Sequence, residues 1–511
     1  MDEEQGERNT VRRVAAWVGV TLAAFALHGY HPYSEDGGIY AAGVKRALDP
    51  GLYPRAAMFV DAHLGMSVFV PFMRDVVRVT HAPLVWVLLA AHLLSVGATL
   101  FGVWEIARRC FAGLGARCGA VALMAVSLTL PIAGTSLCFL DPYVTARSFS
   151  TPLALLALAW MVGRLRGERG RLLLALAAAL GASLFHPLMG GYLVGGMAFL
   201  YCAMRSRWKS AAALCAAAVL VAVAVHALSG RASEAYEAVV RTRDYWFMSR
   251  WQWYEVLGAI APLLIFAGLQ RLRMLSQELR AICAAALLLG LTGLLVAICC
   301  VNSGSGHYMV ARLQPLRTLH LAYGVLIVAL GGLLGETIDG MRNRVTAGVL
   351  GGGLIAGLAL ISGSAQVNLY AHSHHLEMPW MRPQNGWVQA FVWARENTAR
   401  DALFALDADY ITQPDEDAQC FRAFAERSSL PDYSKDGGVA SLAPWMADAW
   451  GAGQMDQTGL SRMTDAERSE RLKDAGVSWM VLRAETPTLL PCEYSNSVVK
   501  VCRLGDAVRL R

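Results

Sequence analysis

Long apolar runs constrain this chain more than any other feature of its sequence. A helix needs roughly 20 apolar residues to cross a hydrocarbon core of about 30 Å. Only 16% of the 511 residues are Asp, Glu, Lys or Arg, and the mean hydropathy is +0.40, so the chain is predicted to be a polytopic membrane protein. Runs that reach or approach the required length lie at roughly 14–30, 82–104, 118–137, 148–163, 172–187, 189–204, 210–229, 254–270, 281–301, 314–334 and 345–362.

The runs predict about eleven transmembrane helices. Those near 148, 172 and 189 are shorter than about 18 residues, so re-entrant or tilted helices are alternatives there. The first run follows Arg12 and Arg13. No small-residue cleavage site comes after it, which favours a signal anchor over a removed signal peptide.

The positive charges of the short connections predict the orientation of these helices. Connections near 138–147, 186–189 and 302–313 carry few of them and alternate with connections that carry many. The N-terminus is therefore predicted to be cytoplasmic, and the C-terminal segment is predicted to lie outside. The cytoplasmic set comprises Arg12, Arg13, Arg108, Arg109, Arg117, Arg164, Arg166, Arg169, Arg171, Arg205, Arg207, Lys209, Arg271, Arg273, Arg280, Arg342 and Arg344.

The uneven spread of charge also predicts the domain organisation. Residues 1–362 form the polytopic domain, with a long first outer loop at 31–81. Within this loop, 65–81 is too polar to span and is predicted to lie as a helix at the membrane interface. A Pro- and Gly-containing linker at 363–384 leads to a small outer α/β domain at 385–511, in which helical patterns alternate with short apolar strands.

Two adjacent carboxylates, Glu35 and Asp36, stand about six residues beyond the first span in "HPYSEDGGIY". At this depth a carboxylate pair can act as a general base or hold a divalent cation such as Mg²⁺ or Mn²⁺ while a lipid-linked substrate stays in the bilayer. The alternative is a polar turn that faces water. Asp36 is the first choice for the base, and Glu35 is expected to orient it or bind a cation.

Further charged residues in the predicted outer connections converge on the same rim. Arginine is suited to a phosphate because its guanidinium donates two parallel hydrogen bonds. Each residue alone also has a structural explanation, such as a turn cap or a side chain that reaches the membrane surface. The expected phosphate or lipid-donor ligands are Arg55, Arg147, His186, Arg312 and Arg317, and the further pocket candidates are Asp61, His63 and Asp141.

Several functions are disfavoured by the composition. No Asp or Glu falls near the middle of a predicted span, whereas ion-coupled transport generally needs such groups. The net charge of +6 is modest and its basic residues flank apolar runs, so nucleic acid is not a predicted partner. The eleven cysteines follow no metal spacing. Cys492 and Cys502 are expected to close a hairpin if the tail meets an oxidising compartment, with Cys420 as the alternative partner.

The C-terminal segment holds the clearest local signals. "WVQAFVWARENT" places Trp387, Phe391 and Ala394 at helical spacing, and "ALFAL" follows as a strand. "TDAERSERLKDAG" opens with a capping box of Thr464 and Glu467 and precedes the strands "SWMVL" and "SVVKVC". The segment has no GxGxxG or Walker loop, so nucleotide binding is not supported.

The acidic pair after the first span, the acidic loop "DPYVTARSFSTPLALLALAW", about eleven spans and an outer C-terminal domain together resemble the GT-C glycosyltransferases. The resemblance implies a polyprenyl-phosphate-linked sugar donor and catalysis by an acid of the first outer loop, here Glu35 or Asp36, with Asp141 in the second. With "FVWARENTARDALF", the quoted segments also resemble uncharacterised bacterial multi-pass proteins, which implies the bacterial inner membrane and a periplasmic C-terminal domain. No WWDYG-like motif occurs in the tail, so oligosaccharyl transfer to asparagine is not favoured. Asp141 stands alone where an Asp-x-Asp is usual, which leaves metal dependence open.

The sequence therefore predicts a membrane glycosyltransferase that moves a sugar from a polyprenyl-phosphate carrier to a glycan, lipid or protein acceptor on the periplasmic side. The expected partners are membrane lipids, the lipid-linked donor and the acceptor. The alternatives are a lipid-linked glycan transporter or flippase and a non-enzymatic envelope assembly protein. A transporter needs a polar path through the helices, and an assembly protein would keep its function in Asp36→Asn.

Overall fold

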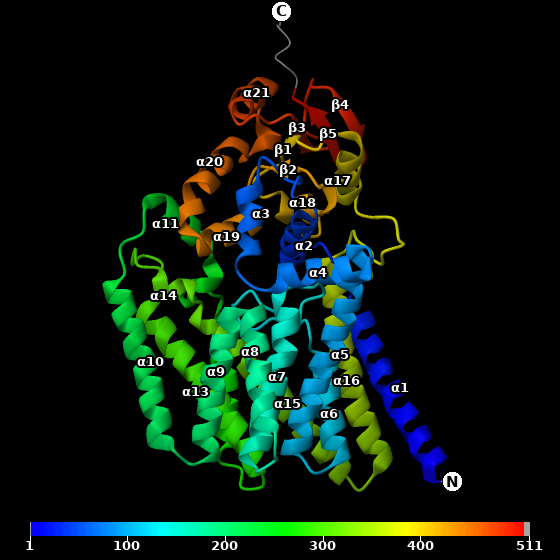
Figure 1. Ribbon diagram of the computed structural model, residues 1–511, viewed down its shortest axis with the longest axis vertical. Coiled ribbons are helices and arrows are strands. Elements are labelled where there is room, and N and C mark those ends of the chain that lie inside the picture. Colours follow the sequence, from blue (N-terminus) through cyan, green and yellow to red (C-terminus); the bar gives the residue numbers. More distant parts are fainter. Residues whose placement is uncertain (1, 505–511) are drawn as a thin grey trace, which may run out of the picture.

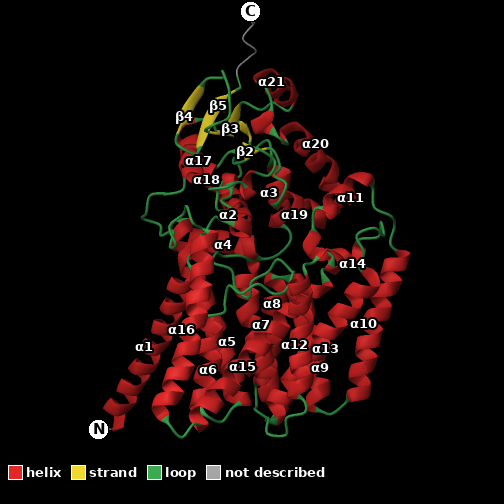
Figure 2. Ribbon diagram, turned by 180° about the vertical axis from the view of Figure 1, so that it is seen from behind, coloured by secondary structure: helices red, strands yellow, loops and turns green. Residues whose placement is uncertain are grey.

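A bundle of long apolar helices carries a layer of short helices and then the C-terminal domain at one end (Figure 1). The computed structural model describes residues 2–504, and the side chains of residues 2–10, 63, 64 and 344 fall outside that description. The view from behind shows the same three layers, with the strands at the end remote from the bundle (Figure 2). The predicted α-helical polytopic fold with a small C-terminal α/β domain is confirmed.

Eight helices of the described chain are long and apolar enough to cross a membrane. Three further apolar helices are shorter, so eleven full-length spans are not confirmed. The long helices are α1 Asp2–His28, α5 Leu84–Cys110, α7 Ala146–Leu165, α9 Pro187–Met204, α10 Trp208–Leu228, α13 Gln277–Cys300, α15 Thr318–Gly340 and α16 Arg344–Leu369. The shorter ones are α6 Leu114–Ala125, α8 Arg171–Phe185 and α12 Trp253–Leu269.

The apolar run at 118–137 does not form one helix, contrary to the prediction. Helix α6 ends at Ala125, and residues 126–145 follow an irregular path to α7. Pro131 lacks the N–H that a helix would need there. Gly134 packs so closely on the Trp251 ring that a Cβ atom would come within 2.5 Å of it. The irregular segment delivers Asp141 to the end of the bundle that faces the C-terminal domain.

The arginine-rich connections gather at the opposite end of the bundle (Figure 1). Arg109 pairs with Glu168 at 3.0 Å, and Arg166 pairs with Glu278 at 3.4 Å. These contacts join the ends of α5, α7 and α13. The clustering of positive charge at this one end is the pattern that the orientation prediction requires.

The predicted first outer loop, 31–81, is mostly helical. It forms α2 Glu35–Leu48, α3 Ala57–Leu64 and α4 Phe69–Thr80. Helix α2 carries acids in its first turn and bases in its last turn, which suits the helix dipole. Helix α4 is the amphipathic helix predicted within 65–81. The layer is completed by α11 Glu234–Arg241, η1 Asp244–Trp246, η2 Met248–Arg250, α14 Met309–Arg312 and η3 Pro315–Arg317.

The C-terminal domain is built on a five-stranded sheet of order β2-β1-β3-β5-β4. Strand β1 is parallel to β2 and β3, whereas β5 is antiparallel to β3 and β4. The strands are β1 Leu403–Ala405, β2 Ser428–Ser429, β3 Trp479–Arg483, β4 Cys492–Ser495 and β5 Val499–Arg503. The helices are α17 Gly386–Asn397, η4 Tyr410–Thr412, α18 Phe421–Ala425, α19 Lys435–Leu442, η5 Pro444–Met446, α20 Ala447–Gln457, η6 Leu460–Arg462 and α21 Asp465–Asp474.

The two faces of the sheet bury alternate strand residues, as the period of a strand requires. Phe404 packs with Trp387 and Phe391 of α17 on one face. Its neighbour Leu403 packs with Leu472 of α21 on the other face. The predicted helix and strand patterns of this segment are confirmed, whereas β2, β4, α18, α19 and α20 were not predicted.

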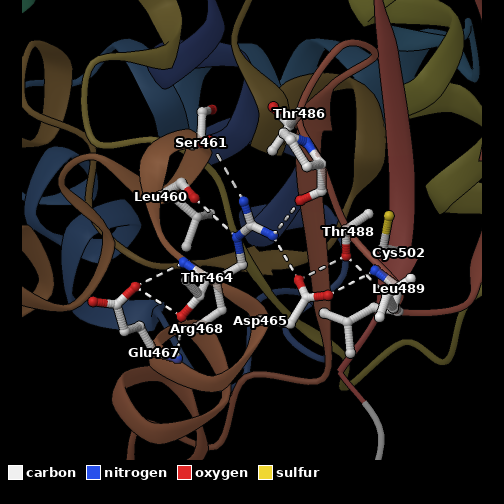
Figure 3. Close-up of polar contacts among 12 residues, drawn as sticks. Leu460, Ser461, Thr464, Asp465, Glu467, Arg468, Thr486, Thr488, Leu489 and Cys502 are labelled. Atoms are coloured by element: carbon white, nitrogen blue, oxygen red, sulfur yellow. Dashed lines mark hydrogen bonds and ion pairs between the residues drawn. The ribbon is translucent and has the colours of Figure 1, made fainter.

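Helix α21 begins at the predicted capping box, in which Thr464 and Glu467 cap each other's backbone N–H groups. Figure 3 shows Arg468 pointing from this helix into a ring of acceptors. Its guanidinium donates to Asp465 at 2.6 Å and to the carbonyl of Leu460 at 3.0 Å. A buried charge needs such partners, so Arg468 fastens the loops around α21.

Cys492 and Cys502 form a disulfide, which settles a pairing that the sequence left open. The two residues are register partners on β4 and β5. The alternative partner, Cys420, is a buried free thiol. It lies in a cluster with Val44 of α2 and Phe69 of α4, so the C-terminal domain and the layer of short helices share one hydrophobic core.

Candidate active site

A cavity of about 870 Å³ lies where the bundle, the layer of short helices and the C-terminal domain meet. The cavity is lined by residues of all three layers, with Tyr143 and His186 from the bundle side and Lys435 from the C-terminal domain. Such a concave, partly apolar cavity with a few convergent polar groups is the usual form of a small-molecule site. Of the residues predicted from sequence, the lining includes Glu35, Asp36, Arg147, His186, Arg312 and Arg317.

Glu35 and Asp36 open helix α2 at the wall of this cavity. The backbone of Glu35 lies in the left-handed region at φ 51°, which is uncommon for a residue with a side chain. Its N–H donates to the carbonyl of Ala418 at 2.8 Å. A Cβ atom on Gly37 would lie 2.8 Å from the Cβ of Tyr143. This close packing fixes where the acidic pair projects.

Lys435 of α19 is the residue that joins the C-terminal domain to the acidic pair. Its Nζ donates to the carboxylate of Glu35 and lies 3.6 Å from Oδ1 of Asp36. The Lys435 side chain is only 15% exposed. Burial lowers the pKa of Lys435, but the charges of Glu35 and Asp36 outweigh it and raise that pKa above its ordinary value, so the side chain stays cationic.

Arg147 approaches Asp36 from the bundle side. Its Nη1 lies 3.6 Å from Asp36 Oδ2, and its Nη2 donates to Asp141 at 2.7 Å. Asp141 is buried behind the cavity wall. Burial raises the pKa of Asp141, while the nearby charge of Arg147 acts against that shift. Asp141 therefore orients Arg147 toward the acidic pair and does not itself line the cavity.

Arg317 and His186 also line the cavity and offer it hydrogen-bond donors. Arg317 stacks its guanidinium 5.9 Å from the ring centroid of Tyr245, and its Nε has no hydrogen-bond partner within residues 2–504. His186 Nδ1 accepts from the N–H of Met189 at 3.4 Å, which leaves the proton on Nε2. Burial lowers the pKa of His186 to about 3, so its ring is neutral at pH 7.

Arg312 lines the cavity and also donates to the carbonyl of Leu442 at 2.6 Å. The structure does not place Arg55 or Asp61 among the described residues of the lining. Arg55 donates to the carbonyl of Gly476 at 2.9 Å, and Asp61 pairs with Arg46. Arg55 thus joins the layer of short helices to the C-terminal domain, and Asp61 joins α3 to α2 within that layer. His63 lies in α3, and its side chain falls outside the part of the chain that the structure describes.

Lys435 is not among the residues predicted from sequence for this site, although its segment "YSKDGG" is polar enough to face a substrate and equally suits an ordinary solvated loop. A signal was nevertheless present. "YSEDGG" at 33–38 and "YSKDGG" at 433–438 share five of six residues, and both segments begin a helix. The differing position is occupied by Glu35 in one and Lys435 in the other, and these two side chains contact each other across 400 residues of sequence.

A divalent metal does not fit the acidic pair as the side chains stand. Lys435 contacts Glu35 and lies near Asp36, and Arg147 approaches Asp36 as well. A metal between the two carboxylates would therefore meet two cations at short range. No group of three His, Cys, Asp or Glu residues capable of holding a metal occurs among the side chains that the structure describes. The carboxylates of Glu35 and Asp36 thus form ion pairs with side chains of the protein itself.

Fold and cavity together define a multi-pass membrane protein with a charged pocket beneath a C-terminal α/β domain. No family model matches the sequence, and no curated protein matches it. Solved structures of similar overall arrangement include two of oligosaccharyltransferases from Archaeoglobus fulgidus, one of them named AglB. One, in complex with an inhibitory peptide and a dolichol-phosphate, is 10% identical with a TM-score of 0.47 and covers 93% of this chain and 70% of its own.

The second, in complex with Zn and sulfate, is 12% identical with a TM-score of 0.47 and covers 92% of this chain and 68% of its own. At this identity and TM-score the likeness concerns the overall arrangement and does not assign an activity.

Proposed function

We propose that this protein is a membrane glycosyltransferase that transfers a sugar from a polyprenyl-phosphate-linked donor to an acceptor. The observation that carries the proposal is the cavity in which Glu35 and Asp36 face Arg147, His186 and Arg317. Acids that can take a proton and cations that can hold a phosphate are thereby brought into one space. The cavity opens at the end of an apolar bundle, where a lipid tail can stay in the membrane.

Asp36 is assigned the role of general base. The acceptor hydroxyl attacks the anomeric carbon and gives its proton to Asp36, while the bond from that carbon to the phosphate oxygen breaks. The electron pair leaves with the polyprenyl phosphate, and the sugar inverts its configuration. A positioned base of this kind contributes about 10²–10⁴-fold to the rate. Glu35 is held by Lys435 and orients its neighbour Asp36.

Arg317 and His186 are assigned to the phosphate of the donor. Arg317 offers an Nε without a hydrogen-bond partner in the described chain, and His186 offers its Nε2 proton. Arg147 lies between Asp36 and Asp141 and stabilises the negative charge that develops as the phosphate leaves. Mg²⁺ or Mn²⁺ is not carried into the proposal because both acids are already paired with cations.

The proposed location is the bacterial inner membrane, with the N-terminus in the cytoplasm and the C-terminal domain in the periplasm. Two observations support this orientation. The arginine-rich connections lie at the end of the bundle opposite the C-terminal domain (Figure 1). The C-terminal domain also carries a disulfide, and disulfides persist in oxidising compartments such as the periplasm.

Mass spectrometry of lipid-linked sugars and envelope glycans in a deletion strain tests the proposal. The strain is complemented with wild type, with Asp36→Asn, or with the control Asp75→Asn, whose side chain lies on α4 in an exposed pair with Arg74. Wild type and the control are expected to restore the same glycans, and Asp36→Asn is expected to keep the deletion profile. Restoration by Asp36→Asn, or identical profiles in all strains, contradicts an enzyme and favours an assembly role.

A further inference from the structure

The acidic pair already has a cation bound to it, and that cation is part of the chain. The Lys435 ammonium contacts the carboxylate of Glu35 and lies 3.6 Å from Asp36. A Lys ammonium is a compact positive charge with three donors. Its place between two adjacent carboxylates is the place where a divalent ion binds when such a pair holds a metal.

The backbone around Lys435 is fixed from several directions. Its N–H donates to Asp432 at 2.5 Å. Arg243 donates to the carbonyls of Ser434 and Tyr433 at 2.6 Å and 2.8 Å. The backbone at the start of α19 is therefore held by both the layer of short helices and the C-terminal domain, which fixes where Lys435 begins its reach to the acidic pair.

The next residue, Asp436, adds a further constraint. It is 2% exposed and pairs with the guanidinium of Arg422 at 2.7 Å. It also accepts from the N–H of Asp432 at 2.9 Å. Breaking a buried ion pair of this kind is strongly destabilising. The helix start that carries Lys435 is therefore expected to stay in the cavity wall.

We propose that Lys435 is the resident cation of this site, which holds Glu35 and Asp36 in the arrangement that a divalent metal would otherwise impose, so that the protein neither binds nor needs such a metal there. The part of the inference that concerns the reaction rests on the proposed function. The part that concerns metal binding does not. The raised pKa of Lys435, in which the charges of Glu35 and Asp36 outweigh burial, supports a permanent positive charge.

Electron paramagnetic resonance with Mn²⁺ as the probe tests the inference without any assay of sugar transfer. The full-length protein in detergent is titrated with Mn²⁺, and bound ion is counted as lost signal of the free ion. Wild type and Glu35→Gln are expected to bind the same amount of Mn²⁺, because the acidic pair holds none in wild type. Lys435→Ala is expected to bind one Mn²⁺ per chain, and the double variant Glu35→Gln/Lys435→Ala is expected to lose it.

Lys45→Ala is the matched control. Lys45 also reaches from the α2 region to an acid of the C-terminal domain, Glu426, at 2.7 Å, but it does not line the cavity among the described residues. Its replacement is expected to create no Mn²⁺ site. If Lys435→Ala does not fold, Lys435→Met takes its place. If neither variant folds, the comparison of Mn²⁺ binding by wild type and Glu35→Gln tests the inference by itself.

Two results would overturn the inference. One is Mn²⁺ bound to wild type and lost in Glu35→Gln. The other is a folded Lys435→Ala that binds no Mn²⁺. Where transfer activity is measurable, wild type is expected to keep it in EDTA, and a chelator-sensitive wild type would also contradict the inference. If only the proposed function is wrong, no sugar transfer is detected, but the Mn²⁺ binding of wild type and variants is still as expected here.

Discussion

The segments 33–38 and 433–438 have nearly the same sequence and begin helices that meet at the same cavity, yet their aspartates have different surroundings. Asp36 is 38% exposed and lines the cavity. Asp436 is 2% exposed and is bound to the buried Arg422. One helix start therefore presents its acid to a space large enough for a ligand, whereas the other uses the same acid to hold the fold.

The differing third position joins the two segments. Glu35 and Lys435 contact each other, so opposite charge at one position turns two similar helix starts into complementary ones. The comparison teaches that residue type and local pattern do not decide between a structural and a chemical role. Access to the cavity and the identity of the partner decide.

The largest expected effect is on turnover in Asp36→Asn. Loss of the base is expected to lower the transfer rate by about 10²–10⁴-fold. Thermal unfolding is expected to stay close to wild type because the amide keeps the shape of the side chain. Initial rates with a polyprenyl-phosphate-linked sugar, together with the unfolding midpoint, measure both quantities. A rate within twofold of wild type would remove Asp36 from the reaction.

Asp436→Asn is expected to show the opposite profile. It leaves the Arg422 guanidinium buried beside a neutral partner, at a cost of about 3–5 kcal/mol. The unfolding midpoint of the C-terminal domain is expected to fall, while the rate per folded molecule is maintained. Tryptophan fluorescence during heating measures the midpoint, because the indole of Trp450 donates to the carbonyl of Asp432 beside this segment. An unchanged midpoint would show that the second segment is not held by this ion pair.

Stability is also expected to depend on pH near the second segment. Burial, then the charge of Asp436, raises the pKa of Asp432 from 3.8 to about 7, against the opposing charges of Arg422 and Lys435. A group whose folded pKa is raised contributes stability at low pH that is lost as pH rises through the folded value. The unfolding midpoint is therefore expected to fall between about pH 4 and pH 7.

Asp432→Asn separates this contribution from the rest of the protein. The variant has no carboxyl to titrate and keeps an oxygen for the N–H of Lys435. Its unfolding midpoint is expected to vary less across this pH range than that of wild type. The same pH dependence in both proteins would assign the effect to another group.

Arg317→Lys tests the phosphate side of the cavity. Lysine keeps the charge but loses the planar fork, and a hydrogen bond to a charged group is worth about 1.5–3 kcal/mol. The KM for the lipid-linked donor is expected to rise about tenfold or more. Arg241→Lys, on the exposed face of α11, is the control. Rates measured against donor concentration check both, and equal KM values in the two variants would exclude Arg317 from donor binding.

The smallest expected effect comes from exchanging the charges that join the segments. Glu35→Lys and Lys435→Glu singly place like charges together, and the double exchange restores an opposite pair. Glu35 is 36% exposed, so the coupling is expected to be at most about 1 kcal/mol. A double-mutant cycle of unfolding midpoints measures it. No recovery in the double exchange would mean that the pair does not join the segments.

The sequence predicted the bundle well because long apolar runs leave a chain few alternatives in a membrane. It also predicted α17, α21 and the central strands of the C-terminal domain, where amphipathic spacing and a capping box act locally. It failed at 118–137, where hydropathy was high but α6 ends at Ala125 and the chain follows an irregular path that contains Pro131 and Gly134. It also did not predict that the 31–81 loop is mostly helical.

The cavity was predictable in part. The acidic pair and several cations of the bundle were brought together as expected. Arg55 and Asp61 do not line the cavity, because each has a partner elsewhere. The charge of a residue alone does not predict the direction of its side chain. Lys435 needed knowledge of how the C-terminal domain docks, which depends on contacts between residues 400 positions apart.

The central claim is that the lipid-phosphate end of the donor binds in this cavity beside Asp36. Photo-crosslinking with a diazirine-bearing polyprenyl phosphate, followed by peptide mass spectrometry, measures this directly. We expect labelling of the lining segments 185–192 and 312–317, and loss of the label when unlabelled polyprenyl phosphate competes. Labelling confined to the exposed helix α10, or labelling that does not compete, would contradict it.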